Sequence, residues 1–473
     1  MFRLWLQLII MKMEINRREF IEKGTKLTLG ISALGLISNN SFAAREPGKK
    51  LNIALVGTGS RGTRTWGKDL MIQYPDQLDM VALCDINPKR LDFAKRYIGT
   101  NAPVYLASDF NRMVEETNPD AVIITTTDCF HAEYAIRAME LGCDVICEKP
   151  LVTEAWQAQK LLDTEKRTGR SIITTFNARH SASAEEIKKV LVSGTLGRII
   201  SAEFMEYLDI DHGASYFRRW HGKSRFSGTL LCHKASHHFD QINWFLDAEP
   251  VEVSAFGDVA FYGKNNAFRG KNCRNCSFAD KCDFYWDISS NQLMTDMYVA
   301  CEKEDGYLRD GCVWDNEIDT FDTMTVEVKY NTGAILSYSL NAFLPYEGQR
   351  IAFNGQKGRL DVRRFQRQSW DPGHGSDFRL THNFKDTKTW HIDPSAGTHG
   401  GADKKLKDLL FLSGQKDPLG KIADSRAGIL SSLIGIAARQ SIETGEKVKI
   451  ADVIDFPVGW TFADNQKAQA GTN

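Results

Sequence analysis

The chain has 473 residues, 42% of them hydrophobic and 25% charged, which is the balance of a soluble globular protein with two or three domains. Lys and Arg total 59 against 60 for Asp and Glu, so the formal net charge at pH 7 is -1. A nucleic-acid-binding face needs concentrated positive charge, and this near-neutral balance argues against nucleic acid as a partner.

Residues 1–44 are predicted to be an export signal. Asn-Arg-Arg-Glu-Phe-Ile at 16–21 precedes a weakly apolar stretch over 24–37, and Ser-Phe-Ala-Ala, which contains three small residues, follows at 41–44. This order is typical of a twin-arginine signal peptide, which exports folded proteins and predicts a periplasmic location. The alternative is a chance arginine pair in a disordered or lipid-facing N-terminus. The apolar stretch is too short for a permanent membrane span, and no later segment reaches that length.

A nucleotide-binding motif follows the first predicted strand, residues 51–56. The motif G-x-G-x-x-G comes next at 57–62, and a helical stretch follows it. In this context the glycines allow a tight turn, a close approach of the backbone to a pyrophosphate, and close packing of helix on strand. The predicted phosphate-binding residues are Gly57, Gly59, Ser60, Arg61 and Gly62.

The predicted ribose-binding residue is Asp85, which ends a second strand at 80–84. A carboxylate at this point can bind both hydroxyls of the adenosine ribose, and it would repel a 2′-phosphate. The next residues, 86–88, supply no arginine for such a phosphate. The sequence therefore favours NAD over NADP as the cofactor.

Two further buried strands are predicted at 121–124 and 144–147, separated by a helix. Strands that alternate with helices predict an α/β fold, a doubly wound parallel sheet whose ligands bind at the carboxyl ends of the strands. We expect this Rossmann domain to cover residues 50–170. The polar residues that follow these two strands complete the predicted cofactor site: Thr126, His131, Glu148 and Lys149.

Four of these features together resemble the glucose-fructose oxidoreductase, inositol dehydrogenase and rhizopine-catabolism family (Gfo/Idh/MocA). They are the glycine motif, Asp85, Thr-Thr-Asp-x-x-His at 126–131 and Cys-Glu-Lys-Pro at 147–150. The resemblance runs from Lys50 to about Ile454. It implies an NAD-dependent enzyme acting on a carbohydrate, with a second, substrate-binding α+β domain over 171–454. That domain would be built on a large, mostly antiparallel sheet, through which such proteins often form homo-oligomers.

The resemblance also places substrate-binding residues after a strand at 171–176. In the family this segment lies near the nicotinamide and the substrate, which makes Asn177 and Arg179 candidates there. An ordinary loop with polar surface residues is equally compatible with the sequence.

The densest cluster of histidines lies between residues 227 and 240. The segment resembles the family's Gly-Gly-x-Leu-x-Asp-x-Gly-x-His-x-x-Asp, which places His237 on the catalytic histidine and Asp240 on its partner. His233 falls where the family often has aspartate, and it shares a face with His237 if both are helical. A zinc site is an alternative, but the glutamate of a His-Glu-x-x-His motif is missing, so we expect no metal. A purely structural role is a third possibility.

An aromatic and basic segment at 211–221 precedes these histidines. Aromatic rings stack on the apolar faces of sugars, and forked donors bind hydroxyls, so we predict substrate contacts here. The alternative is a partly exposed loop that covers the domain. The candidates are Tyr216, Arg219 and Trp220.

Cys273, Cys276 and Cys282 form a C-x2-C-x5-C pattern, with Cys301 or Cys312 as a possible fourth member. Thiolates in this number can hold a structural zinc, whereas an oxidising compartment could pair them as disulfides. Free thiols are the third possibility. All three alternatives are structural.

Beyond the cysteines, residues 320–330 and 334–341 alternate between polar and apolar and are joined by Asn-Thr-Gly. The pattern predicts a hairpin of an antiparallel sheet with one solvated face. A last helix with an apolar stripe is expected near 429–444.

The predicted chemistry is oxidation of a secondary hydroxyl, at C3 of a sugar or glycoside or on a cyclitol. Lys149 would accept the hydroxyl proton, and burial would lower its pKa toward a working value. His237 would share the proton, Asp240 would fix its tautomer and His233 would complete the hydrogen bonds. One alternative is a redox-neutral, NAD-assisted glycoside hydrolase. Another is a protein that binds NAD and sugar without turnover.

Overall fold

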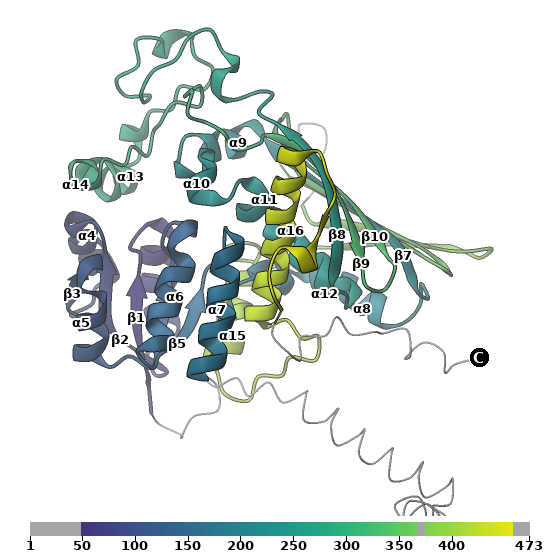
Figure 1. Cartoon of the computed structure of the whole chain (residues 1–473), viewed down its shortest axis with the longest axis horizontal. Helices are drawn as coiled ribbons and strands as arrows, with labels where there is room; N and C mark the ends of the chain where they lie inside the picture. The colour runs from purple at the N-terminus through teal and green to yellow at the C-terminus, as the bar shows by residue number, and fades with distance from the viewer. Residues whose placement is uncertain (1–48, 367–373, 457–473) are drawn as a thin grey trace, which may run out of the picture. The chain divides into compact units, whose positions relative to one another are not determined.

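The computed structural model describes residues 49–366 and 374–456, so the predicted export signal lies outside the described residues. Two sheets organise this part of the chain, and helices cover them (Figure 1). Among the described helices, none combines the length and apolar character that a membrane crossing requires.

The first sheet has seven strands in the order β15-β6-β5-β4-β1-β2-β3. All neighbouring strands are parallel except β15, which runs antiparallel to β6. The central strand β4 is buried along its whole length, as the apolar runs in the sequence predict. The doubly wound parallel sheet is confirmed. Its strands are β1 (Leu51–Val56), β2 (Leu78–Asp85), β3 (Val104–Leu106), β4 (Ala121–Ile124), β5 (Asp144–Cys147), β6 (Ile172–Thr174) and β15 (Ala423–Asp424).

Helices between the strands begin and end at residues that suit those positions. In α4, the Asn87 side chain accepts a hydrogen bond from the Arg90 N–H, Pro88 takes the first turn, and Gly99 ends the helix with a positive φ. The helical segments are η1 (Arg61–Lys68), α3 (Asp69–Gln73), α4 (Pro88–Ile98), η2 (Ala107–Asp109), α5 (Phe110–Thr117), η3 (Asp128–Phe130), α6 (His131–Glu140) and α7 (Ala155–Thr168).

The first sheet extends beyond the boundary that we expected at residue 170. Strand β6 pairs with β5 through Ile172 and Val145, so it belongs to this sheet and not to the second domain. Strand β15, far along the chain, then adds to the outer edge of β6. Two segments from beyond residue 170, β6 and β15, therefore supply strands of the first sheet.

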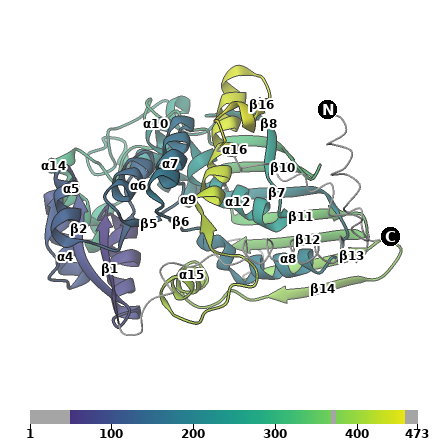
Figure 2. The same ribbon diagram turned by 60° about the horizontal axis from the view of Figure 1, so that its bottom comes forward.

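The second sheet has nine strands in the order β14-β13-β12-β11-β7-β10-β9-β8-β16, antiparallel except for the pair β7 and β10. The predicted hairpin is confirmed as β9 and β10. Burial alternates along β9, where Met324 is buried and Thr325 is exposed, so one face packs and the other is open (Figure 2). Its strands are β7 (Ile199–Asp209), β8 (Pro250–Asp258), β9 (Thr323–Tyr330), β10 (Ile335–Leu344), β11 (Glu347–Gly355), β12 (Gly358–Gln366), β13 (Ser376–His382), β14 (Thr387–Ile392) and β16 (Val448–Lys449).

The long helix α16 joins the two halves (Figure 1). It packs on β8, α11, α12 and β6, and Gly435 lets α11 approach, because a Cβ there would lie 2.6 Å from the Leu231 carbonyl oxygen. The remaining helical segments of this half are η4 (Asn177–His180), α8 (Ala182–Val192), α9 (Ile210–Phe217), η5 (Trp220–Gly222), α10 (Ser224–Ser227), α11 (Leu230–His233), α12 (Ala235–Leu246), α15 (Ala402–Phe411), α16 (Ser425–Thr444) and η10 (Ile450–Asp452).

A long excursion of residues 259–322 leaves the second sheet between β8 and β9 and reaches the first domain. The Asn87 side chain donates to the Cys301 carbonyl oxygen at 2.9 Å, and Arg90 pairs with Asp305 at 2.7 Å. Figure 1 shows its helices α13 and α14 beside α4. We call residues 259–322 the strap. Its segments are η6 (Gly263–Asn265), η7 (Ala279–Lys281), η8 (Ile288–Ser290), α13 (Gln292–Met297), η9 (Val299–Cys301) and α14 (Glu302–Asp305).

Candidate active site

The glycine loop between β1 and η1 has the shape of a pyrophosphate cradle. Gly57 has a φ of +89°, and a Cβ on Gly62 would lie 2.0 Å from the Gly57 carbonyl oxygen, so packing requires both glycines. Gly59 is different, because a Cβ there would meet only the Tyr298 hydroxyl, at 3.7 Å. The loop therefore leaves open space at Gly59, which is the glycine that lets the pyrophosphate approach the backbone in this motif.

Asp85 lies at the end of β2, where the sequence places it. One carboxylate oxygen accepts hydrogen bonds from the N–H and the hydroxyl of Thr58, at 2.6 and 3.0 Å. The other accepts from the Asn87 N–H at 2.9 Å and from Arg90 at 3.2 Å. The contact of Arg90 with Asp85 was not predicted from the sequence. Its two terminal nitrogens pair with Asp85 and with Asp305. The carboxylate is thus fixed at the loop, and the arginine that contacts it, Arg90, is shared with Asp305.

The side chains of Arg61 and Glu148 contact each other, and their predicted contacts with cofactor stay predictions. Arg61 Nε donates to Glu148 at 2.6 Å, and its terminal nitrogens form a two-pronged contact with Asp403 of α15. Trp66 also donates to Glu148, at 2.8 Å. These buried charges are paired, as burial demands, and they tie the glycine-loop helix to the end of β5. Ser60 instead offers its backbone N–H, which donates to the Tyr298 hydroxyl of the strap at 2.9 Å.

Both ring nitrogens of His131 contact backbone carbonyl oxygens, and its predicted contact with cofactor stays a prediction. Its Nδ1 lies 2.7 Å from the Pro150 carbonyl oxygen and its Nε2 lies 3.1 Å from that of Thr126. The buried ring therefore holds the ends of β4 and β5 at a fixed spacing. Thr126 is partly exposed at the same edge of the sheet, and its contact with cofactor stays a prediction.

Lys149 follows β5 at the carboxyl edge of the sheet. Its Nζ donates to the His233 carbonyl oxygen at 2.8 Å and lies 3.5 Å from His233 Nε2. Burial lowers the pKa of Lys149 to about 8, although the charges of Asp128 and Glu148 oppose this fall. A substantial fraction of its amine is therefore neutral near physiological pH and able to accept a proton.

Asp128 and His233 form the carboxylate–imidazole pair of the site. His233 Nδ1 lies 2.6 Å from an Asp128 carboxylate oxygen, which leaves Nε2 facing Lys149. Burial lowers the pKa of His233 well below its usual value, and the charge of Lys149 adds to the effect. Burial raises the pKa of Asp128, while Lys149 opposes that rise. We infer that the pair holds one proton between its two members and presents Nε2 to Lys149.

The predicted pairing of His237 with Asp240 is wrong. Asp240 accepts two hydrogen bonds from Arg179, at 2.6 and 2.7 Å, and both side chains are buried. His237 Nδ1 is buried with no hydrogen-bond partner among the described residues, and its ring contacts the edge of Phe176. Arg179 therefore forms a buried ion pair with Asp240, and its contact with substrate stays a prediction. His237 stays close enough to Lys149 for that charge to depress the pKa of its imidazole, after burial itself.

A break in the helix explains this arrangement. His233 ends α11, Lys234 intervenes, and His237 belongs to α12, so the two histidines do not share one continuous helical face. His233 turns toward Asp128, and α12 directs Asp240 toward η4. Asn177 likewise donates to Asp403 at 2.8 Å, so its side chain stabilises the same buried carboxylate as Arg61, and its contact with substrate stays a prediction.

The aromatic candidates gather around His233. The Tyr216 and Trp220 rings lie 5.3 and 5.8 Å from the His233 ring, and His221 lies between, 4.1 Å from His233 and stacked on Trp220. Arg219 precedes η5 and holds the Ser215 carbonyl oxygen through Nε. The structure therefore brings these residues to Lys149 and His233, and their individual contacts with substrate stay predictions.

Asp128 is the functional residue that the predicted site omitted. It comes shortly after β4, whereas Asp85 is the last residue of β2, so its place after a buried strand is the signal that could have revealed it. Lys234 was also missed. It pairs with the buried Glu206 at 3.1 Å, beside a Gln349 side chain that donates to the same carboxylate.

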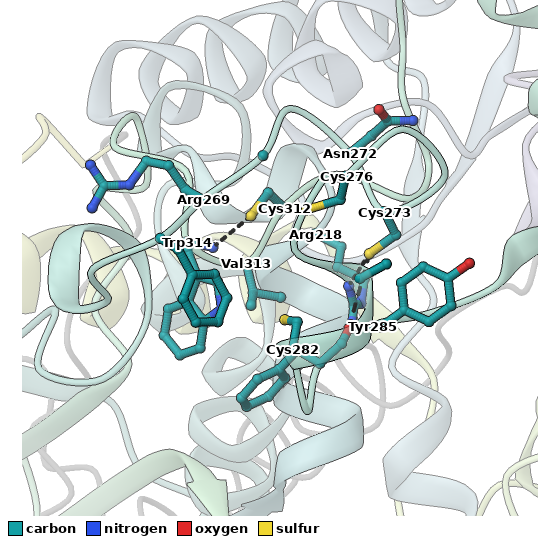
Figure 3. Close-up of a pocket in the computed structure, with 14 residues that line it drawn as sticks. Arg218, Arg269, Asn272, Cys273, Cys276, Cys282, Tyr285, Cys312, Val313 and Trp314 are labelled. Atoms are coloured by element: carbon teal, nitrogen blue, oxygen red, sulfur yellow. Dashed lines mark hydrogen bonds between the residues drawn. The ribbon is translucent and has the colours of Figure 1, made fainter.

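Four cysteines of the strap line one small cavity of about 20 Å³ (Figure 3). The fourth member is Cys312 and not Cys301, whose sulfur contacts the Asp296 carbonyl oxygen elsewhere. All ten cysteines are free thiols. Within the described ranges, no three His, Cys, Asp or Glu side chains are grouped as metal ligands. The cavity lining comprises Cys273, Cys276, Cys282 and Cys312 together with the residues drawn in Figure 3.

Comparison with known proteins matches this architecture in both halves. Residues 51–176 match the NAD-binding Rossmann fold of the Gfo/Idh/MocA oxidoreductase family, and residues 188–450 match its C-terminal alpha/beta domain. The chain belongs to this family. It is an oxidoreductase whose first domain binds NAD.

Relatives of the chain include sugar dehydrogenases. YteT of Bacillus subtilis, named as an oxidoreductase, is 33% identical over 86% of this chain and 99% of its own length. The D-glucoside 3-dehydrogenase of Escherichia coli is 28% identical over 32% of this chain and 41% of that enzyme. The WlbA dehydrogenase of Bordetella pertussis, solved with NADH and UDP-GlcNAcA, shares the fold with a TM-score of 0.59 at 19% identity, covering 85% and 99% of the two chains.

Replacing Gly59 with Ala is expected to weaken NAD binding about 10- to 100-fold without unfolding the protein. The added methyl fits the protein itself but enters the space left for the pyrophosphate, where overpacking costs about 1–3 kcal/mol. Calorimetric titration with NAD and the thermal midpoint measure the two effects. Gly62→Ala is the matched comparison, because its methyl meets backbone and should lower the midpoint itself. Unchanged NAD affinity in Gly59→Ala would contradict the assignment.

Proposed function

We propose that the protein oxidises a secondary ring hydroxyl of a sugar or cyclitol, with C3 of a glycoside as the favoured position. The observation that supports this most strongly is the Lys149 amine, held against the Asp128–His233 pair at the carboxyl edge of the NAD-binding sheet. Bound NAD⁺ supplies the acceptor for the hydride that leaves the same carbon. The name of the Escherichia coli relative, a glucoside 3-dehydrogenase, supports the choice of position.

The chain's own residues supply proton transfer and orientation. The neutral Lys149 amine accepts the hydroxyl proton, and the His233 carbonyl oxygen holds Nζ in place while it does so. His233 Nε2, 3.5 Å away, can take a share of that proton because Asp128 stabilises the imidazole at Nδ1. The partly exposed ring of Trp220, beside His233, is the apolar surface on which a sugar ring would stack.

The rate of oxidation should rise with pH through a midpoint near 8. Only the neutral amine of Lys149 accepts a proton, and this form gains population as pH rises through the lowered pKa of about 8. A profile of kcat/KM from about pH 6 to about pH 10 measures it. An ordinary exposed lysine would place the midpoint of the kcat/KM profile at about 10.4 instead. A midpoint there, or a flat profile, would remove Lys149 from the proton-transfer step.

A panel of glycosides and inositols tests the reaction type. Each is incubated with the protein and an artificial electron acceptor, and the products are identified by mass spectrometry. The proposal expects a keto-sugar that retains its aglycone, or a keto-inositol. In NAD-assisted hydrolysis, oxidation at C3 is followed by elimination of the aglycone, addition of water and return of the hydride. Free sugar released without any acceptor would therefore favour that reaction, and binding without any product would favour a non-catalytic role.

We also propose that the enzyme works in the periplasm and forms homo-oligomers through the open face of the second sheet. The paired arginines at 17 and 18 support the first point. For the second, Phe256 and Ile335 lie on that face, 78% and 48% exposed, opposite the exposed Thr325 and Lys329 of β9. Cell fractionation and light scattering of the purified protein test the two points.

A further inference from the structure

Two arginines near the active site have no acidic partner among the described residues. Arg219 and Arg309 form no ion pair within that part of the chain, whereas Arg61, Arg90 and Arg179 each hold a carboxylate. The Arg219 guanidinium lies 5.3 Å from the centre of the Tyr216 ring. The Arg309 guanidinium lies 5.2 Å from the centre of the Trp286 ring. Both side chains are only partly exposed.

The surroundings of Arg219 contain positive charge and hydroxyls. Burial, together with the positive charge of Arg309, lowers the pKa of Arg219 to about 10. The hydroxyls of Tyr216, Tyr298 and Tyr307 are its other close electrostatic neighbours. A buried cation that lacks a counter-charge is unfavourable, and a bound anion would offset this cost.

The position of the two arginines relates them to the reacting groups. Tyr216, under Arg219, contacts His233 edge-on at 5.3 Å, and the charge of Arg219 acts on the pKa values of His233 and Asp128. Arg309 lies 5.9 Å from the ring of Tyr298, whose hydroxyl accepts the Ser60 N–H of the glycine loop. An anion held by both would therefore lie next to the site of hydroxyl oxidation, on the side covered by the strap.

We propose that Arg219 and Arg309 bind a carboxylate carried by the sugar, so that the substrate is an acidic sugar of the glycuronic type. This inference rests on the proposed function. A guanidinium binds a carboxylate through two parallel hydrogen bonds, and the neighbouring, partly exposed Trp220 ring suits the sugar to which the carboxylate is attached. A phosphate of the cofactor has the same anionic chemistry. We assign the carboxylate because Arg219 adjoins the rings around His233, while the pyrophosphate has the glycine loop.

Binding measurements on the NAD-loaded protein test this assignment. A set of methyl glycuronides is titrated calorimetrically, each beside the neutral methyl glycoside of the same configuration. For at least one pair, the wild type should bind the acid about 10- to 100-fold more tightly, as expected for charged hydrogen bonds. Arg219→Gln and Arg309→Gln should each remove most of that preference and leave the affinity for NAD unchanged. Arg225→Gln, on the exposed surface of α10, should retain it.

The binding and product measurements distinguish failure of the carboxylate site, binding of a cofactor phosphate and failure of the proposed oxidation. A preference for the acid that survives both substitutions, or no preference in any pair, overturns the carboxylate site. Weaker NAD binding in the two variants, with sugar binding unaltered, also overturns it and assigns the arginines to a cofactor phosphate. Failure of the proposed oxidation would look different, because the arginine-dependent preference would persist while no member of any pair yielded a keto-sugar.

Discussion

Replacing Lys149 with Met is expected to lower kcat about 10²–10⁴-fold, the usual contribution of a positioned acid or base. Methionine keeps a similar length but cannot accept a proton. The Nζ contacts are with His233 and not with the glycine loop, so the affinity for NAD should change little. Steady-state kinetics and calorimetric titration with NAD measure the two quantities.

Lys160→Met is the control, because Lys160 is exposed on α7. It should behave as the wild type in both measurements. A Lys149→Met enzyme that keeps most of its activity would show that another group accepts the proton. A variant that loses NAD binding together with activity would show that Lys149 serves the cofactor.

Replacing Asp128 with Asn is expected to lower kcat by about 10²-fold, because the imidazole of His233 loses the charge that stabilises it. It should also shift the pH profile. The Asp128 charge raises the pKa of Lys149, so its removal should move the rise in kcat/KM to lower pH. A defect that was only structural would lower the rate without moving the midpoint.

Asp240→Asn is the matched comparison, since both residues are buried carboxylates. Asp240 pairs with Arg179, so its loss should lower the thermal midpoint while the folded enzyme keeps its kcat and its pH profile. If Asp240→Asn lost kcat and shifted the profile while Asp128→Asn did not, the original pairing of His237 with Asp240 would be restored.

The parts of the site that could be predicted from sequence are those encoded within a short segment. The glycine loop and Asp85 follow strands in a fixed order, and the structure places them as that order predicts. Lys149 is found at the carboxyl edge of the sheet for the same reason. In each case the backbone of a single β-α unit determines the position.

The histidine pairing could not be predicted in this way, because it depends on contacts between distant segments. Asp128 and His233 are 105 residues apart, and only the packing of α11 against the first domain brings them together. A nearer carboxylate, Asp240, matched the family pattern but is neutralised by Arg179. The strap has no periodicity that would predict its position, so the placement of Tyr298 on the glycine loop emerged only from the structure.

The most direct test of the proposed chemistry is a single turnover. Purified protein loaded with NAD⁺ is mixed with substrate in the absence of oxygen and electron acceptors, and the absorbance of bound NADH is followed in time. We predict one equivalent of NADH in the wild type, formed together with a keto-sugar, and a rate about 10²–10⁴-fold lower in Lys149→Met. Release of free sugar with no NADH remaining, or equal rates in the two proteins, would contradict the proposed oxidation and the role of Lys149 in it.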